Sequence, residues 1–406
     1  MPSALARHWR LDPAVTFLNH GSFGACPVPV LEAQRELRDR MESEPVRFLA
    51  RELDDQLSEA RAALGRFVGA DPDDLGFVAN ATGAVNAVVR SLRFERGDEI
   101  LTTDHEYNAV LNVLRHVAAR DGARVVLVRL PFPAQSPDET VEHVLGAAGE
   151  RTRLAVLSHV TSPTALVLPV ERIVQALADR GIDVLIDGAH APGMLPLDLG
   201  RLGAAYYAGN LHKWVCAPKG AGFLHVRRDR QADVRPATIS HGANSPAGAR
   251  TRFRLEFDWQ GTLDPTPWLA IPAALEFVER IVGGGWPAAM ARIHELALEG
   301  GRDLASTLET EHAPAEMIGA MVAVALPAGG PLGGAASPDQ SSPLDADPLQ
   351  TVLFDRFGIE VPIYGWPVPA AESPDPPRRL IRISAALHND RADFDRLIAA
   401  LRELGG

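Results

Sequence analysis

Residues 182–193 read IDVLIDGAHAPG and residues 206–226 read YYAGNLHKWVCAPKGAGFLHV, and these two stretches indicate how the chain folds. Each stretch begins with a short apolar run typical of a buried β-strand. Polar side chains follow where each run ends: Asp187 and His190 in the first stretch, and Asn210, His212 and Lys213 in the second. Because ligands bind at the carboxyl ends of the strands of a parallel sheet, we expect these side chains to lie at one site.

Similar apolar runs, rich in β-branched residues, precede these two stretches. They are EILTT at 99–103, ARVVLVRL at 123–130 and RLAVLSHV at 153–160. Segments with apolar residues at helical spacing separate the runs, as at 108–120 and 170–181. Strands that alternate with helices in this way predict an α/β fold with a mostly parallel central sheet, covered by helices on both faces.

The pattern changes near residue 275, after which helices are followed by strands and by loops dense in Pro, Gly and Ser. The strands are expected in MVAVALP at 321–327 and RRLIRISAALH at 378–388, and the loops at 327–348 and 363–379. We therefore expect a large domain over 15–274 and a smaller C-terminal α+β domain over 275–406, with residues 1–14 packing on the smaller one.

The composition excludes several classes of protein. The net charge is −12, so no basic field exists to attract a nucleic acid. Two cysteines, Cys26 and Cys216, are too few for a disulfide framework, which favours the reducing cytoplasm. The first residues lack the apolar core of a signal peptide, and no run approaches the roughly 20 apolar residues of a membrane helix. We expect a cytoplasmic protein that binds neither nucleic acid nor membrane.

Lysine is nearly absent from this chain. Of the 40 lysine and arginine residues, only Lys213 and Lys219 are lysines. Arginine stays protonated in proteins and cannot act as a nucleophilic amine. A lysine in a chain that otherwise uses arginine is therefore a candidate for chemistry that needs an amine. The alternative is that both lysines remain by chance.

A carboxylate and a lysine at neighbouring strand ends suit pyridoxal 5′-phosphate (PLP). The aldehyde of PLP bonds a lysine amine as a Schiff base, and its ring nitrogen stays protonated beside a carboxylate. The protonated ring stabilises a carbanion at the α-carbon of an amino acid. A plain ion pair between Lys213 and Asp187 at the sheet edge is the alternative.

Eight motifs follow one another along the chain: FLNHGSFGACP, NATGAVNAV, TTDHEYNAV, SHVTSPTALVLPVERI, VLIDGAHAPG, YYAGNLHKWVCAPKG, FDWQGTLDPTPWLAIPAAL and LIRISAALHND. In this order they resemble the motifs of the class V aminotransferase family, and more narrowly those of its isopenicillin N epimerase branch. The resemblance runs from about residue 15 to residue 395. It implies an aspartate-aminotransferase-like fold (fold type I) and a homodimer with active sites at the subunit interface.

The resemblance also implies roles for single residues. Lys213 matches the Schiff-base lysine, and Asp187 matches the carboxylate that pairs with the pyridine nitrogen. His190 matches the residue that touches the phenolic oxygen of the cofactor, and Tyr107 the aromatic residue that stacks on its ring. His105 is expected to lie behind these groups or in the core.

The cofactor phosphate needs hydrogen-bond donors. Thr82, Gly83 and Ala84 open a predicted helix, where free backbone N–H groups and the helix dipole favour an anion. Taken alone, this turn would be interpreted as an ordinary connection between a strand and a helix. The resemblance adds Asn210 and His212 from the same chain, and Gly261 and Thr262 from the other subunit.

Arg382, in the motif LIRIS, matches the arginine that clamps the α-carboxylate of the substrate, for which the guanidinium fork is suited. Four further residues are expected around the substrate and the cofactor oxygen: Asn19, His20, Thr161 and Ser162. Arg47 and Arg51, one helical turn apart, are candidates for a second substrate carboxylate. A solvated helix face is the alternative for this pair.

The resemblance favours an amino-acid epimerase similar to isopenicillin N epimerase. Lys213 would remove the α-proton, and a group on the opposite face, Tyr107 or His20, would return one. The alternative is a PLP-dependent C–S lyase or aminotransferase of secondary metabolism. A desulfurase that forms a persulfide is disfavoured, because the loop before Arg382 contains no cysteine.

Other classes of function fit less well. A non-catalytic sensor is disfavoured because the candidate lysine is present and no basic patch is. A nicotinamide oxidoreductase would need a G-x-G-x-x-G motif after a strand, and the sequence has none. A metal hydrolase built on Asp187 and His190 would need a third ligand at suitable spacing, so we expect no metal.

Overall fold

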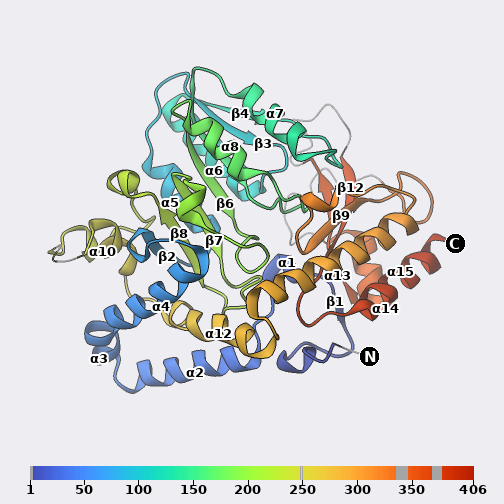
Figure 1. Ribbon diagram of the computed structural model, residues 1–406, viewed down its shortest axis with the longest axis horizontal. Coiled ribbons are helices and arrows are strands. Elements are labelled where there is room, and N and C mark those ends of the chain that lie inside the picture. The colour runs from blue at the N-terminus through green and yellow to red at the C-terminus, as the bar shows by residue number, and fades with distance from the viewer. Residues whose placement is uncertain (1–2, 247, 249, 335–345, 368–376) are drawn as a thin grey trace.

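A seven-stranded sheet forms the centre of the molecule (Figure 1). The computed structural model describes residues 3–246, 248, 250–334, 346–367 and 377–406. The strand order is β2–β8–β7–β6–β5–β3–β4. The strands are β2 (Leu75–Val78), β3 (Glu99–Thr103), β4 (Arg124–Val128), β5 (Thr152–Ser158), β6 (Asp183–Gly188), β7 (Tyr206–Asn210) and β8 (Gly222–Val226).

The prediction of a mostly parallel sheet is confirmed. Strand β8 runs antiparallel to both of its neighbours, β7 and β2, and every other pair in this sheet is parallel. The parallel pairing sends the carboxyl ends of β5, β6 and β7 to one edge of the sheet. In the register of these strands, Asp187 lies beside Ser158 on one side and Ala208 on the other.

Helices cover both faces of the sheet because its strands are apolar on both sides. Leu185 and Tyr206 belong to the core on the face packed against α5, α6 and α10. Their neighbours Ile186 and Tyr207 point the other way, into the core shared with α7 and α8. These helices are α5 (Ala81–Ser91), α6 (Asn108–Asp121), α7 (Pro137–Ala147), α8 (Val170–Ala178) and α10 (Arg252–Asp258).

A smaller antiparallel sheet in the C-terminal part has the strand order β11–β12–β9. Its strands are β9 (Met321–Ala325), β11 (Ile363–Trp366) and β12 (Arg378–Ser384), and α13 (Gly285–Thr307) and α15 (Arg391–Gly405) pack beside it (Figure 1). The predicted α+β architecture of this part is confirmed. The division at residues 274 and 275 stays a prediction.

The N-terminal segment joins this C-terminal part. Strand β1 (Thr16–Phe17) pairs in parallel with β10 (Ile359–Glu360), and Ser3 donates a hydrogen bond to the carbonyl of Leu387. The second predicted loop differs from expectation, since residues 363–366 form β11. Residues 335–345 and 368–376 of the two loops lie outside the described residues.

The remaining helices link these parts. They are α1 (His20–Phe23), α2 (Val28–Ser43), α3 (Pro45–Arg47), α4 (Leu53–Val68), α9 (Leu199–Leu202), α11 (Thr266–Leu269), α12 (Ile271–Ile281) and α14 (Pro348–Phe357). Within the described ranges, none of the helices combines the length and the apolar character required to span a lipid bilayer.

A glycine in β7 lets aromatic rings pack against the strand backbone. A Cβ atom at Gly209 would lie 2.2 Å from the ring of Phe223, far closer than two carbon atoms approach. Phe223 in turn stacks on Tyr207, with ring centroids 6.2 Å apart. The absence of a side chain at Gly209 therefore permits the close packing behind the strand that leads to Lys213.

A buried ion pair ties α4 to the edge of the large sheet. The guanidinium of Arg61 pairs with the carboxylate of Asp258 in α10 and donates to the carbonyl of Leu75 in β2. It also lies over the ring of Phe77, 4.7 Å from the centroid. Both partners of the ion pair are buried. Asp258 also lies 3.8 Å from Nε of Arg254, but it is the carboxylate paired with Arg61, so removal of Asp258 leaves the Arg61 charge without compensation.

We expect Asp258→Ala to lower the free energy of unfolding by about 3–5 kcal/mol, because it leaves the Arg61 charge buried and unpaired. Glu403→Ala, which breaks the exposed pair with Arg356, is the control and should cost less than about 1 kcal/mol. Urea unfolding of both variants is the measurement. Equal losses for the two variants would contradict this interpretation of the Arg61 pair.

Candidate active site

A cavity of about 260 Å³ lies at the carboxyl ends of β5, β6 and β7. Seven of the predicted site residues line it: Thr82, Tyr107, Asp187, His190, Asn210, His212 and Lys213. Ser162, expected near the cofactor oxygen, lines it as well. Residues that the sequence did not single out complete the wall, among them Ser22, Phe23, Ser158 and Tyr364.

The side-chain amine of Lys213 is almost removed from water, with 9% of the residue exposed. Its Nζ lies 3.1 Å from Nε2 of His190. Burial, followed by the positive charge of Arg382, lowers the pKa of Lys213 to about 7, while Asp187 opposes this shift. A large share of the amine is therefore neutral near pH 7, which is the form that attacks an aldehyde.

Asp187 ends β6 and faces the same cavity. It accepts a hydrogen bond of 2.9 Å from the backbone N–H of Ala189. Burial raises the pKa of Asp187, and the hydrogen bond from Ala189 and the charge of Lys213 oppose that rise. A cation placed in the cavity beside Asp187 would therefore be stabilised, and would itself stabilise the ionised carboxylate.

His190 is neutral in this setting. Burial, and then the charge of Lys213, hold its pKa well below the usual range. While Nε2 lies near Lys213, Nδ1 is buried and has no hydrogen-bond partner within the described residues. Nδ1 of His212, which also lines the cavity, is without a partner in the same way. Such buried polar atoms mark places where a bound group would complete the hydrogen bonding.

The amino end of α5 differs in part from expectation. The side chain of Asn80 caps the helix and accepts the N–H of Gly83 at 2.8 Å, and the backbone carbonyl of Asn80 accepts the N–H of Ala84. The N–H of Ala81 donates to Oδ1 of Asn210. Of the three predicted anion donors, only the N–H of Thr82 has no partner among the described residues.

Arg382, in β12, is completely buried and is not among the residues that line the cavity. Its two terminal nitrogens donate to Ser162 and Ser22, both of which line the cavity. The guanidinium also lies over the ring of Tyr364, 4.9 Å from the centroid. Nε of Arg382 has no partner within the described part of the chain. The guanidinium is therefore held in one orientation with bonding capacity left over.

Asn19 and His20 lie behind the cavity wall, not on the substrate side as expected. Nε2 of His20 lies 3.0 Å from the carbonyl of Lys213, and its Nδ1 lies 3.2 Å from the ring of His388. Asn19 donates to Glu360 and accepts from the hydroxyl of Ser22. Both side chains are already committed to neighbours in the protein, so they support the site from outside.

Thr161 and His105 are likewise structural. Thr161 bonds the hydroxyl of Thr164 and the N–H of Leu166, which closes the turn after β5. His105 is fully buried between Thr164 and the carbonyl of Leu130, as one of its two expected placements required. Thr161 is not among the residues that line the cavity.

Gly261 and Thr262 do not reach the cavity of their own chain. Gly261 has a φ of +108°, and no atom lies within 4 Å of the position that a Cβ would take. Thr262 and the following Leu263 are exposed. Arg47 and Arg51 are exposed, and Arg47 pairs with the half-buried Glu52, which fits the surface role given as the alternative for Arg47 and Arg51.

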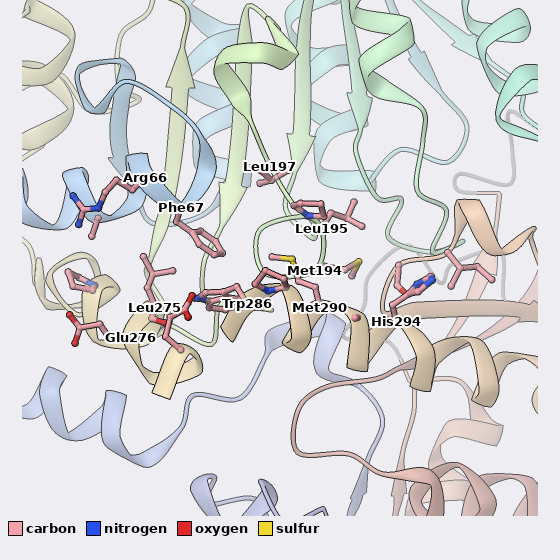
Figure 2. Close-up of a pocket in the computed structure, with 18 residues that line it drawn as sticks. Arg66, Phe67, Met194, Leu195, Leu197, Leu275, Glu276, Trp286, Met290 and His294 are labelled. Carbon is pink, nitrogen blue, oxygen red and sulfur yellow. The ribbon is translucent and has the colours of Figure 1, made fainter. Parts of the chain in front are cut away.

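A second cavity, of about 800 Å³, lies elsewhere and contains none of the predicted site residues. Figure 2 shows Met194, Leu195 and Leu197 on one side of it, facing Trp286 and Met290 of α13. Its lining is mainly apolar. Within the described ranges, no group of three or more His, Cys, Asp or Glu side chains could hold a metal ion. The smaller cavity, which contains the predicted site residues, is therefore the candidate active site.

Comparisons of the sequence with known proteins give matches over most of the chain. A family model described as "Aminotransferase class-V" matches residues 23–327. The isopenicillin N epimerase of Amycolatopsis lactamdurans is 40% identical, over 97% of this chain and 96% of that protein. An L-cysteine desulfhydrase of Arabidopsis thaliana is 32% identical, over 99% of this chain and 90% of that protein.

Two solved structures share the architecture. A mutant of C-DES with glycine covalently linked to the PLP cofactor superposes with a TM-score of 0.77 at 24% identity, and covers 96% of this chain and 97% of its own. The cysteine desulfurase CsdA of Escherichia coli gives 0.76 at 20% identity, with 98% and 97% covered. The expected fold type I architecture is thereby confirmed.

We expect PLP added to the purified protein to produce a visible absorbance band that borohydride abolishes, because Lys213 presents a neutral amine in the cavity. Lys213→Ala should lose the band. Lys219→Ala should keep it, since the Lys219 amine donates to the carbonyl of Gly24 and does not line the cavity. Absorbance spectra of the three proteins are the measurement, and a band retained in Lys213→Ala would contradict the assignment.

Proposed function

Because this chain belongs to the class V aminotransferase family, we propose that it is a PLP-dependent epimerase that inverts the α-carbon of an amino acid. One observation carries the proposal: the amine of Lys213, with its lowered pKa, shares a cavity with the buried carboxylate of Asp187. The name of the relative that is 40% identical supports epimerisation as the reaction.

The residues around the cavity fit PLP. Lys213 would bind the aldehyde, and Asp187 would pair with the ring nitrogen. Tyr107, half-buried at the start of α6, would cover one face of the ring. The N–H of Thr82, at the positive end of the α5 dipole, and His212 would receive the phosphate. The unpaired Nδ1 of His190 and of His212 would gain partners.

Bound PLP supplies an electron-withdrawing ring, which makes the α-hydrogen of an attached amino acid acidic. Once the substrate amine had replaced that of Lys213 on the aldehyde, Lys213 would be free to take up this proton at Nζ, as an amine whose pKa of about 7 suits a general base at neutral pH. Epimerisation requires that a second group returns a proton to the opposite face. No net oxidation occurs, because one proton leaves the α-carbon and one comes back.

The hydroxyl groups in the cavity wall are the candidates for that second group. Tyr107 and Tyr364 both line the cavity, and Ser22 lies 3.2 Å from the hydroxyl of Tyr364. His20 is a poor candidate, since both of its ring nitrogens are engaged behind the wall and burial lowers its pKa to about 4. Of Tyr107 and His20, the two proton donors expected from the sequence, Tyr107 therefore remains the candidate.

Arg382 would bind the α-carboxylate of the substrate. Its fork is oriented by Ser22 and Ser162, and its charge lies near Lys213 and His190, whose pKa values it lowers. A carboxylate bound there would hold the α-carbon at a constant position relative to the amine of Lys213.

We propose in addition that the active unit is a homodimer, in which Gly261 and Thr262 of a second copy complete the phosphate site. Thr262 is exposed, Gly261 is partly exposed, and neither lines the cavity of its own chain, which supports this arrangement. Phe23, a large apolar side chain that is 54% exposed at the cavity, would be covered at the same interface.

A C–S lyase is the second candidate. A relative named L-cysteine desulfhydrase matches 99% of the chain at 32% identity. An aminotransferase on the same scaffold is the remaining alternative.

A panel of L-amino acids in deuterated water distinguishes these reactions. We expect deuterium to enter the α-position with loss of chirality, because the proton returned from the opposite face comes from solvent. Pyruvate with sulfide or thiol would establish the lyase, and a keto acid with the pyridoxamine form of the cofactor the aminotransferase. Mass spectrometry and chiral chromatography are the measurements. No exchange with any substrate would contradict the epimerase.

We expect Arg382→Lys to raise KM about 10- to 100-fold with a smaller change in kcat, because lysine keeps the charge and loses the two-pronged bond to the carboxylate. Arg378→Lys, on the same strand but with an exposed side chain, is the matched control and should leave KM unchanged. Steady-state kinetics on the substrate found in the panel test this, and an unchanged KM in Arg382→Lys would refute the assigned role.

A further inference from the structure

A second buried carboxyl group lies beside Asp187 and has no role in the proposed function. It belongs to Glu106, in the loop between β3 and α6, and only 2% of the residue is exposed. The hydroxyl of Ser158 donates to its Oε1 at 2.7 Å, and the N–H of Tyr107 donates to the same oxygen at 2.8 Å. Oε2 is buried and has no hydrogen-bond partner among the described residues.

This pattern of bonds suits a protonated carboxyl group. An ionised carboxylate spreads its charge over both oxygens, and a buried oxygen with no donor leaves half of that charge without compensation. Protonation at Oε2 removes the charge while Oε1 keeps both of its donors. Burial, and secondarily the negative charge of Asp187, raise the pKa of Glu106 to about 8, against the opposing bonds from Ser158 and Tyr107.

The sheet brings the two carboxyl groups together. Ser158 lies directly beside Asp187 in the register of β5 and β6, and Ser158 is also the residue that holds Glu106. Two carboxyl groups placed so close in a dry environment do not both ionise. Their surroundings differ, since Asp187 faces the cavity, the N–H of Ala189 and Lys213, whereas Glu106 faces the protein interior.

We infer that Glu106 is a positioning residue that carries the one proton of a Glu106–Asp187 carboxyl pair, so that Asp187 stays ionised at the cavity wall. Glu106 acts through Asp187 and touches neither substrate nor cofactor. The inference rests on the proposed function only in assigning the ring nitrogen to Asp187. The state of the proton belongs to the protein itself and can be measured without PLP.

The test is the thermal unfolding of the apoprotein between pH 5 and pH 9, for the wild type and for Glu106→Gln. The folded wild type keeps the proton on Glu106 up to about pH 8, whereas the unfolded chain releases it above the ordinary glutamate pKa. Unfolding therefore releases a proton in this window, and the contribution of Glu106 lowers stability as the pH rises. Glutamine, neutral at every pH, lacks this contribution.

We expect the unfolding midpoint of Glu106→Gln, relative to the wild type, to rise steadily from pH 5 and to level off near pH 8. The other titratable groups around the pair are Lys213, Tyr107 and Tyr207, and they are present in both proteins. Glu142→Gln, exposed on α7, is the control and should show a flat difference. A flat difference for Glu106→Gln would overturn the inference.

Asp187→Asn tests the coupling. Without the neighbouring negative charge, the pKa of Glu106 should fall. The difference in unfolding midpoint between Asp187→Asn and the double variant Asp187→Asn/Glu106→Gln should therefore level off at a lower pH. An unchanged pH would show that the two groups do not share a proton. If Glu106→Gln does not fold, Ser158→Ala replaces it. This variant removes the hydroxyl that donates to Glu106, so the pKa of Glu106 should rise, and the fall in the unfolding midpoint should continue to a higher pH than in the wild type.

Addition of PLP to the same proteins separates the two proposals. A protein that binds no PLP but shows the expected pH series overturns the proposed function and leaves the proton on Glu106 established. A protein that binds PLP and shows a flat series overturns the inference about Glu106 alone.

Discussion

The parallel pairing of β6 with β7 is the constraint on which the site depends. It places the carboxyl ends of the two strands side by side, so that Asp187 and the residues after Asn210 face one cavity. Both strands are buried, and the polar groups that follow them are therefore withdrawn from water as well. The lowered pKa of Lys213 and the raised pKa of Asp187 have the same origin, since burial disfavours the charged form of each.

Support for this arrangement comes from the other end of the chain. Arg382 extends from the small antiparallel sheet and is held by serines that belong to two other segments. His20 holds the backbone carbonyl of Lys213 from behind. The surroundings of the reactive amine thus include groups from both the first and the last parts of the sequence, since Arg382 lowers the pKa of Lys213 through its charge, and this environment exists only when these parts have assembled.

Much of this organisation could be predicted from the sequence, and the remainder depends on tertiary packing. The strands around Asp187 and Lys213 were predictable because their apolar runs are continuous and their polar residues come at the ends. The side-chain directions of Asn19 and His20 were not, because a motif orders residues along the chain and does not say which face each side chain takes. The capping by Asn80 could have been inferred, since asparagine before a helix is a common N-cap residue. Glu106 could not, because a carboxylate in a loop is ordinarily exposed, and its burial and its bond with Ser158 arise from tertiary packing.

The rarity of lysine has a practical consequence for the chemistry of the whole molecule. Side-chain amines occur at two positions only, six residues apart, and one of them lies in the cavity. Acylating or cross-linking reagents that act on such amines will hardly modify the surface, which carries its positive charge as guanidinium groups. A lysine-specific protease will likewise cut the unfolded chain at two places, after Lys213 and after Lys219. The products are two large fragments and the short peptide 214–219 between them. Amine-directed probes that are indiscriminate on most proteins are therefore close to site-specific on this one.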